Sequence, residues 1–474
     1  MSQIAAIALL ALRSVFRSRV VLVLSGMLFA AAFLLPLALR SDGTPEGLIR
    51  IHLDYVLGIA AFLLTLSTLW AGCAAVSQEA DDKTLQLLLV KPVPRLRIWL
   101  GKWVALLLLD ALLLALVGAA AAATLQHKLR RGGFDPGALA AARQTTLAAL
   151  QTLRAPLPDV ESDVRAEFER LRAARALPEN AADSVVLDSI RRTELARRYS
   201  IAPGAAHVWT FDLSAGPRRA GPLMVQFKAD SSVPGAADIH GALELQIDGR
   251  TFARDLLAMP GNSQTVVFEG IPAGASQAVV SFRNGGTRDA TLFFDPSDGL
   301  VLRRPAGTFA GNYLRALAQI YLQLALFAAI GVALGTLFSM PVATFLTLVL
   351  ILVLQLSGFI VAAAQVDRAT FVQNVAPFGA VSHSHGAAAA APPGSSFAAR
   401  AAASVLFYAY RGTYLALRPL LEDRTLDDLS TGTCLPPRDL LRNFLQQFIV
   451  LPAFLALLSA AVLRKREWAL PNLS

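Results

Sequence analysis

The sequence has little charge, little cysteine and none of the common catalytic motifs. Only 16% of its 474 residues are charged, whereas soluble domains carry about 25%. Two cysteines, Cys73 and Cys434, are too few for a disulfide framework. The chain contains no Walker A loop, no HExxH, no CxxC and no GxSxG motif. We therefore expect a protein that is not an enzyme, with no ATP site and no cofactor of its own.

Metal-ligand patterns are equally sparse. His383 and His385 form an HxH pair in a polar stretch, and alternate histidines can share one metal. Two ligands alone favour a solvated loop over a metal site, so we predict no metal.

Long apolar runs are what the sequence has in abundance, with 55% hydrophobic residues. About 20 apolar residues in a helix cross a bilayer core of about 30 Å. Six runs meet this length, namely residues 20–39, 55–76, 103–124, 313–338, 342–364 and 444–463. The predicted fold is an α-helical polytopic membrane protein with six transmembrane helices. Residues 2–18 predict a short amphipathic helix at the membrane surface, or alternatively an extension of the first span.

The basic residues indicate the orientation of these spans. The formal net charge is +9, but the bases lie largely beside apolar runs, which points to membrane lipid rather than nucleic acid as partner. Bases cluster in 13–19, 83–102 and 464–466, and short basic segments stay cytoplasmic. We therefore predict a multi-pass protein of the bacterial inner membrane with both termini in the cytoplasm.

A long polar insertion follows the third span. Residues 136–200 are rich in Ala, Arg, Glu and Leu at helical spacing, which predicts two or three helices. From His207, six or seven short runs of β-branched and aromatic residues alternate with turn sequences such as Asp248–Gly249. This pattern predicts an inserted extracytoplasmic α+β domain that contains an antiparallel β-sandwich.

These features divide the chain into six parts. They are the surface helix with spans 1–3 (1–125), an extracytoplasmic helical region (126–206), the β-sandwich (207–310), spans 4–5 (311–364), an extracytoplasmic loop with an amphipathic helix over 397–418 (365–442), and span 6 with the cytoplasmic tail (443–474).

One carboxylate lies inside a predicted span. Asp110 is about seven residues into the third span, where a charge costs a few kcal/mol and should face protein or water. It either lines a translocation path or subunit interface, or bonds to a neighbouring helix through a residue such as Ser67 or Gln355. Both interpretations stay open.

The segment 78–102 is a charged interruption between two spans. Acids come first, then a leucine cluster, then bases, and Pro92 and Pro94 end the helix predicted for residues 81–90. A membrane protein without an ATP site that is driven by a separate ATPase needs such a cytoplasmic docking element. The alternative is a basic loop that sets topology and has no partner.

The residues of this segment resemble the corresponding loop of type 2 ABC transporter permeases. The resemblance is carried by Glu79, Lys83–Thr84–Leu85, Leu87–Leu88, Pro92, Arg95, Ile98 and Gly101–Lys102, with Lys83 where glycine is common. It covers the spans and not the insertion at 126–310. The group it resembles most is labelled multicopper-enzyme maturation or gliding-motility permeases.

The resemblance implies a homo- or heterodimer of permease subunits with ABC ATPase subunits that bind ATP and Mg. The residues it implies for ATPase contact are Glu79, Asp81, Asp82, Thr84 and Leu85, and those for fixing the loop to the third span are Pro92, Arg95, Gly101 and Lys102.

The predicted function is the permease subunit of an ATP-driven ABC exporter. A second interpretation is a complex that does not transport but transmits motion to periplasmic or envelope partners through the external domain. A third is a membrane-anchored receptor without an ATPase.

Overall fold

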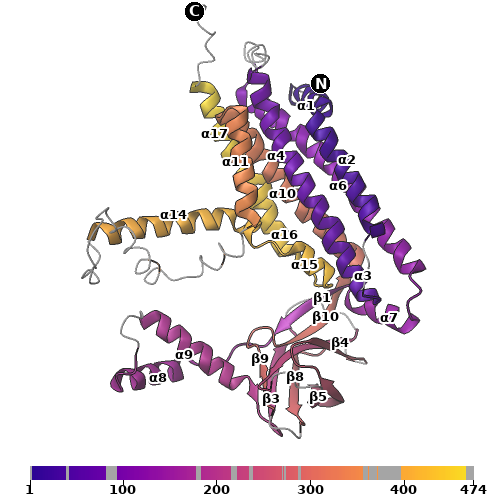
Figure 1. The fold of residues 1–474 in the computed structure, drawn as a ribbon, viewed down its shortest axis with the longest axis vertical. Helices are drawn as coiled ribbons and strands as arrows, with labels where there is room; N and C mark the ends of the chain where they lie inside the picture. Colours follow the sequence, from indigo (N-terminus) through magenta and orange to yellow (C-terminus); the bar gives the residue numbers. More distant parts are fainter. Residues whose placement is uncertain are drawn as a thin grey trace, which may run out of the picture. The chain divides into compact units, whose positions relative to one another are not determined.

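The computed structural model describes residues 3–38, 42–81, 93–177, 183–214, 221–233, 239–269, 274–286, 290–355 and 397–465, together with residues 271, 361 and 371. The chain forms two compact units (Figure 1). The helical unit consists of Met1–Ala149, Gly307–Val361 and Ala416–Ser474, and the inserted unit of Leu150–Ala306 and Ala362–Leu415.

The helical unit contains apolar helices and several short connecting helices. They are α1 (Gln3–Arg17), α2 (Arg19–Ala38), α3 (Pro45–His52), the π-helical turn η1 (Leu53–Leu57), α4 (Gly58–Asp81), α6 (Arg95–Arg131), α7 (Pro136–Thr145), α10 (Phe309–Leu337), α11 (Met340–Gln355), α15 (Thr425–Ser430), α16 (Pro437–Asn443), the π-helical turn η3 (Phe444–Val450) and α17 (Leu451–Lys465).

Five helical segments in the described ranges are long and apolar enough to cross a membrane, which makes this a multi-pass membrane protein. They are Arg19–Ala38, Pro45–Asp81, Arg95–Arg131, Phe309–Leu337 and Pro437–Arg464. The predicted span over 342–364 coincides with α11, which is described for 16 residues only, up to Gln355. Because about 20 residues are needed to cross, the sixth span stays a prediction.

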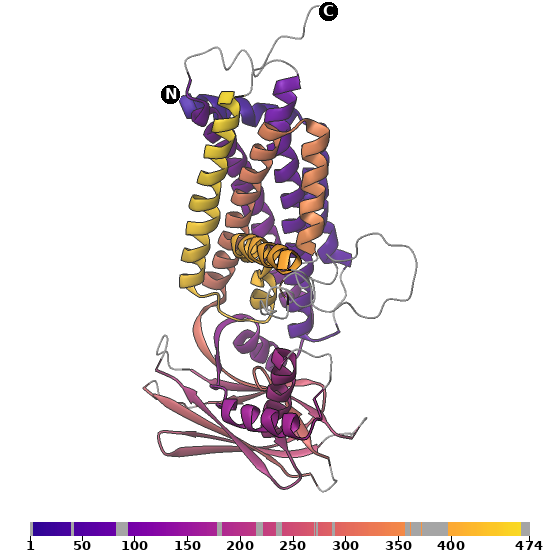
Figure 2. The same ribbon diagram turned by 90° about the vertical axis from the view of Figure 1, so that its left-hand side faces the viewer.

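The N-terminal helix is separate from the first span. Helix α1 ends at Arg17 and α2 begins at Arg19, and Figure 2 shows α1 running across one end of the bundle. Its small buried residues Ala8 and Ala11 pack against Ala105 of α6. The alternative of one continuous helix is therefore wrong, while a location of α1 at the membrane surface stays a prediction.

The tightest helix contact joins α4 and α10 through glycines. A Cβ added to Gly72 would lie 2.9 Å from the Cα of Gly331, and one added to Gly335 would lie 3.0 Å from the Cα of Cys73. Gly331 and Gly335 form a GxxxG pattern, which lets helix backbones approach closely inside a membrane. Trp103 of α6 adds an indole hydrogen bond to the carbonyl of Ala325, 2.8 Å away.

Helix α6 is longer than the predicted third span at 103–124. It begins at Arg95, directly after Pro94, and continues to Arg131. The predicted boundary at 125/126 therefore falls inside a helix. Helix α4 ends at Asp81, and the remainder of the helix predicted for 81–90 lies outside the described residues.

The inserted unit contains antiparallel sheets where the sequence predicts strands. Its strands, with the first and last continuing a few residues into the helical unit, are β1 (Ala148–Arg154), β2 (Ser200–Ile201), β3 (Ala206–Asp212), β4 (Leu223–Ser231), β5 (Ile239–Ile247), β6 (Arg250–Ala258), β7 (Ser263–Phe268), β8 (Gln277–Asn284), β9 (Leu292–Phe294) and β10 (Leu300–Thr308). One sheet has the order β1-β10-β4-β9-β2 with β7 also paired to β4, and the other has the order β3-β8-β5-β6.

Aromatic side chains from both sheets meet in one core. The ring centroids of Phe227 and Phe282 are 5.4 Å apart, those of Phe282 and Phe294 5.2 Å, and those of Trp209 and Phe294 5.3 Å. Each of these pairs takes one residue from each sheet. Aromatic contacts of this kind add about 0.5–1.5 kcal/mol beyond the area they bury.

Two corrections concern strands. Residues 148–154 lie in a stretch predicted to be helical, but they pair with β10 as β1, since strand pairing overrides a weak helix preference. Strand β6 was not predicted either, although Asp248–Gly249 marked the turn before it. Both turn residues have positive φ, +47° and +76°, and Ile247 pairs with Arg250 across them, which is the geometry of a two-residue hairpin.

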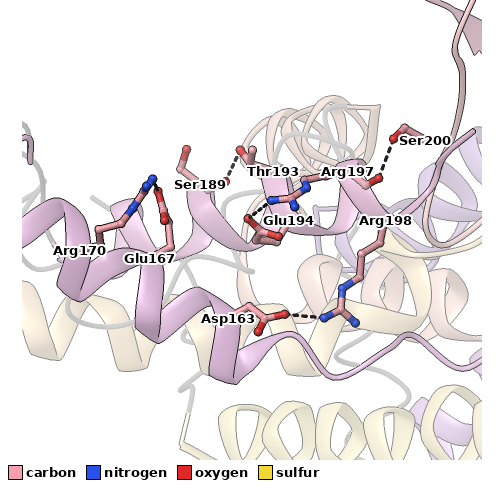
Figure 3. A network of polar contacts seen from close by, with 9 residues as sticks. All are labelled: Asp163, Glu167, Arg170, Ser189, Thr193, Glu194, Arg197, Arg198 and Ser200. Carbon is pink, nitrogen blue, oxygen red and sulfur yellow. Dashed lines mark hydrogen bonds and ion pairs between the residues drawn. The ribbon is translucent and has the colours of Figure 1, made fainter. Parts of the chain in front are cut away.

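The remaining helices of the inserted unit are α8 (Glu161–Ala173) and α9 (Asp183–Arg198), and α14 (Phe397–Leu421) has residues in both units. Val164, Phe168 and Ile190 form the small core between α8 and α9. Figure 3 shows the polar contacts around this helix pair, among them the ion pair of Asp163 with Arg198. Such exposed pairs contribute about 0–1 kcal/mol each, so the apolar contacts carry the packing.

We predict that Gly335→Ala destabilises the protein by about 1–3 kcal/mol, because the new methyl group meets the backbone of α4. The matched control is Gly26→Ala in α2, where nothing lies within 4 Å of the added Cβ. This control should be neutral or stabilising by up to about 1 kcal/mol, because alanine favours helix. Thermal unfolding of the purified chain in detergent measures both. Equal effects of the two variants would contradict the close α4–α10 contact.

Candidate functional site

An ion pair joins the two helices that flank residues 82–92. The Nζ of Lys102 in α6 lies 2.6 Å from Oε2 of Glu79, in the last turn of α4. The Lys102 side chain is 2% exposed and that of Glu79 26%. Lys102 also donates a hydrogen bond to the backbone carbonyl of Ala75, one turn earlier in α4.

The Lys102 ammonium is buried and therefore needs an opposite charge and hydrogen-bond acceptors nearby. Removing an ammonium from water costs several kcal/mol unless an opposite charge and further hydrogen bonds compensate it. Glu79 supplies the charge and Ala75 an additional acceptor. The last turn of α4 is therefore held against α6, about two turns after α6 begins.

Gly101 brings the N-terminal helix to the same place. A Cβ at this position would lie 2.6 Å from Cγ2 of Ile7 and 3.3 Å from the carbonyl oxygen of Ile4, so only glycine permits this crossing of α1 and α6. Arg97 donates a hydrogen bond of 2.7 Å to Oε1 of Gln3. The structure places Gly101 against α1, and its role in fixing the loop to the third span stays a prediction.

Arg95 connects the beginning of α6 to the end of the chain's last helix. Its guanidinium donates a hydrogen bond to the carbonyl of Leu463, in the last turn of α17. The final carbonyls of a helix have no partner within the helix, and a basic side chain there satisfies one of them and interacts favourably with the helix dipole. Helices α1, α4, α6 and α17 thus meet around residues 95–102.

Several predicted site residues belong to the connection between α4 and α6. Of those predicted to contact the ATPase, Asp82, Thr84 and Leu85 lie outside the described residues, and Asp81 is the exposed last residue of α4. Pro92, predicted to fix the loop to the third span, also lies outside them. Their roles therefore stay predictions.

Asp110 lies deeper in the bundle. It is 2% exposed and accepts a hydrogen bond of 2.7 Å from the hydroxyl of Thr68 in α4. Its second carboxylate oxygen has no hydrogen-bond partner in the described part of the chain. The bond to a neighbouring helix comes from Thr68 rather than from Ser67, because successive residues of α4 point in different directions. The Gln355 side chain lies outside the described residues.

Metal-ligating side chains do not converge in the described ranges. Among the described residues, no group of three or more His, Cys, Asp or Glu side chains could hold a metal ion. His383 and His385 lie outside those residues.

Sequence reasoning identified the two charged partners but not their surroundings. Gln3, Ile7 and Leu463 contact the flanking residues from opposite ends of the chain, and no local pattern connects positions so far apart. The GxxxG pattern at Gly331 and Gly335 was readable in the sequence and would have indicated the close helix contact.

The fold and this site define a multi-pass membrane protein in which a buried ion pair joins the two helices that flank residues 82–92. Residues 5–153 match the family model described as ABC-2 family transporter protein. The match covers less than half of the chain and supports a type 2 ABC permease, a transporter membrane subunit without its own ATP site. Searches of curated proteins and of solved structures found no match.

We predict unequal effects for the two members of the ion pair. Glu79→Ala should destabilise the protein by about 3 kcal/mol, because it leaves the Lys102 ammonium buried without an opposite charge. Lys102→Met should cost less than about 1 kcal/mol, because Glu79 is partly exposed and water can solvate it. Thermal unfolding in detergent measures both.

The double variant Glu79→Ala/Lys102→Met is the control for this prediction. It removes both charges and should recover most of the stability lost in Glu79→Ala. A larger loss in Lys102→Met than in Glu79→Ala, or no recovery in the double variant, would contradict a buried ion pair.

Proposed function

We propose that this chain is the membrane subunit of a bacterial ABC exporter, in which a separate ATPase drives rearrangement of the spans. The observation that carries the proposal is the buried ion pair of Glu79 with Lys102, which joins the last turn of α4 to α6 about two turns after α6 begins. The family match over residues 5–153 supports the permease part of the proposal.

Movement of this connection would reach four helices. Displacement of residues 82–92 by the ATPase acts on α4 and α6 through Glu79 and Lys102. It then acts on α1 through the contact of Gly101 with Ile7, and on α17 through the bond from Arg95 to Leu463. A connection held at both ends transmits force to the helices, whereas a loop free at either end would absorb it.

Charge supports a cytoplasmic location for this end of the helical unit. Arg97 at the beginning of α6 contacts Gln3 of α1, and Arg95 contacts Leu463 at the end of α17. The three basic segments of the sequence adjoin these helix ends along the chain, and short basic segments remain in the cytoplasm. Both termini are then cytoplasmic, and residues 126–310 are extracytoplasmic, on the far side of the inner membrane.

A second permease subunit is part of the proposal. In α2, Leu22, Val23, Phe33 and Leu34 are all more than half exposed, so this helix has a large apolar face that lipid or another subunit must cover. The choice between a homodimer and a heterodimer is left to experiment.

We interpret the two antiparallel sheets of the inserted unit as a β-sandwich that binds cargo or an envelope partner. Exposed sheet edges and loops suit either role. The size of this insertion sets the chain apart from ordinary type 2 permeases. The resemblance of the spans points to the group labelled multicopper-enzyme maturation or gliding-motility permeases.

The second candidate is a complex that moves envelope partners without transport. It is favoured by the direct passage from β10 to α10, since β10 ends at Thr308 and α10 begins at Phe309. The Thr308 hydroxyl accepts a hydrogen bond of 3.2 Å from the Gly311 amide and so caps α10. No linker residue separates the strand from the helix. ATP-driven transport in reconstituted vesicles would exclude this candidate.

We predict that Leu85→Asp abolishes co-purification of an ATP-hydrolysing subunit with the tagged chain, because a carboxylate would replace an apolar contact at the proposed docking element. The control is Leu157→Asp, at a position 51% exposed in the inserted unit, which should retain the ATPase.

Normal ATPase recovery with Leu85→Asp would contradict the docking role of this segment. Failure of the wild-type chain to retain any ATPase would favour the receptor without an ATPase.

A further inference from the structure

A polar cavity of about 200 Å³ lies in the helical unit, at the end where α10 and α16 begin. Its lining residues come from α10, α15 and α16, from residues 422–424 before α15, and from residues 435–436 between α15 and α16. Figure 1 labels these three helices. A cavity of about 10–15 Å³ is enough for one water molecule, so this one has room for a ligand of several heavy atoms.

Two amides in this cavity are incompletely bonded. Gln319 is 5% exposed, and its Oε1 accepts a hydrogen bond of 3.1 Å from Nδ2 of Asn443. Within the described part of the chain, Nε2 of Gln319 and Oδ1 of Asn443 have no partner. A buried donor or acceptor without a partner is unfavourable, so this pair is suited to a ligand that both accepts and donates hydrogen bonds.

Three guanidinium groups line the same cavity, those of Arg315, Arg424 and Arg442. Arg315 extends from α10, Arg442 from α16, and Arg424 precedes α15. The Arg315 guanidinium donates two long hydrogen bonds, one of 3.4 Å to the carbonyl oxygen of Leu435 and one of 3.5 Å to Sγ of Cys434. Arginines that approach from different helices are well suited to a phosphate group.

Carboxylates balance these arginines. Glu422, Asp423, Asp428 and Asp439 also line the cavity, with Glu422 paired to Arg418 at 2.7 Å and Asp439 to Arg442 at 3.4 Å. A simple anion would meet four carboxylates here, and a simple cation three arginines. A dipolar ligand with a phosphate at one end and an ammonium at the other matches both sets.

The surface beside the cavity is apolar. Leu441 and Leu445 are 60% and 49% exposed, on the segment Pro437–Arg464 that is long enough to cross a membrane. A lipid whose headgroup occupies the cavity would place its acyl chains along this surface.

We propose that this cavity binds a phosphoethanolamine group, and that its source is a phosphatidylethanolamine lipid. The arginines hold the phosphate, the carboxylates hold the ammonium, and the Gln319–Asn443 pair takes the remaining hydrogen bonds. This site is separate from the ATPase-coupling residues and does not depend on that function.

The test uses the full chain in nanodiscs that contain phosphatidylcholine as the bulk lipid. Addition of phosphatidylethanolamine should raise the unfolding temperature, and native mass spectrometry should retain one such lipid per chain. Phosphatidylglycerol lacks the ammonium, and choline headgroups have no N–H donors, so neither should reproduce the effect. Soluble glycerophosphoethanolamine, added to phosphatidylcholine nanodiscs, shows whether the headgroup alone suffices; an equal rise would identify a soluble ligand instead of the lipid and overturn the assignment of the source.

Variants connect this effect to the cavity. Gln319→Leu and Asp439→Asn should each weaken phosphatidylethanolamine binding about tenfold or more. The Asp439 side chain is 53% exposed, so Asp439→Asn should leave the fold intact. Asp427→Asn, on the same short helix as Asp428 and outside the cavity lining, should bind normally. Unchanged lipid preference in both cavity variants, or an equal response to phosphatidylglycerol, would overturn the proposal.

Discussion

The buried ammonium of Lys102 is the constraint on which this end of the helical unit depends. A charge that is 2% exposed in an apolar helix bundle must have an opposite charge within reach, and Glu79 at the end of α4 provides it. The pair fixes where α4 ends relative to α6. Gly101 and Arg95, within two turns of Lys102 on the same helix, then place α1 and α17. Four helices are thereby joined around a connection that would otherwise only link two of them.

Elsewhere in the helical unit, α4 and α10 pack through close contact of their backbones rather than through large side chains. Gly72, Gly331 and Gly335 let α4 and α10 meet with almost no side-chain volume between them, and polar groups in the bundle are shared between helices, as in the bond from Thr68 to Asp110. The second carboxylate oxygen of Asp110 has no hydrogen-bond partner among the described residues, and burying it is unfavourable. The bond from Thr68 gives Asp110 a role in helix packing, and a role in lining a transport path stays a proposal.

Much of the architecture was predictable because it depends on local patterns. Hydropathy located the long spans, and strands β3, β4 and β8 coincide with runs of β-branched and aromatic residues. Local patterns failed where distant residues decide. Strand β1 has a helix-forming composition and is a strand only because β10 lies beside it. The contacts of Gly101 with Ile7 and of Arg95 with Leu463 join positions that no periodicity connects, so the charged segment was predictable and its attachment was not.

We propose that both ends of the 82–92 connection move as one body when a partner ATPase acts on them. Electron-spin distance measurements between labels at Gln78 and Leu96 test this proposal, because both residues are exposed, one near the end of α4 and the other at the beginning of α6. The chain would be measured in complex with a co-purified ATPase subunit, without nucleotide and with ATP bound. If the two ends move together, the label distance has one narrow distribution that is the same in both states. A distance that widens by several ångströms on ATP binding would show that the Glu79–Lys102 pair opens, and would contradict the proposal that the two ends move as one body.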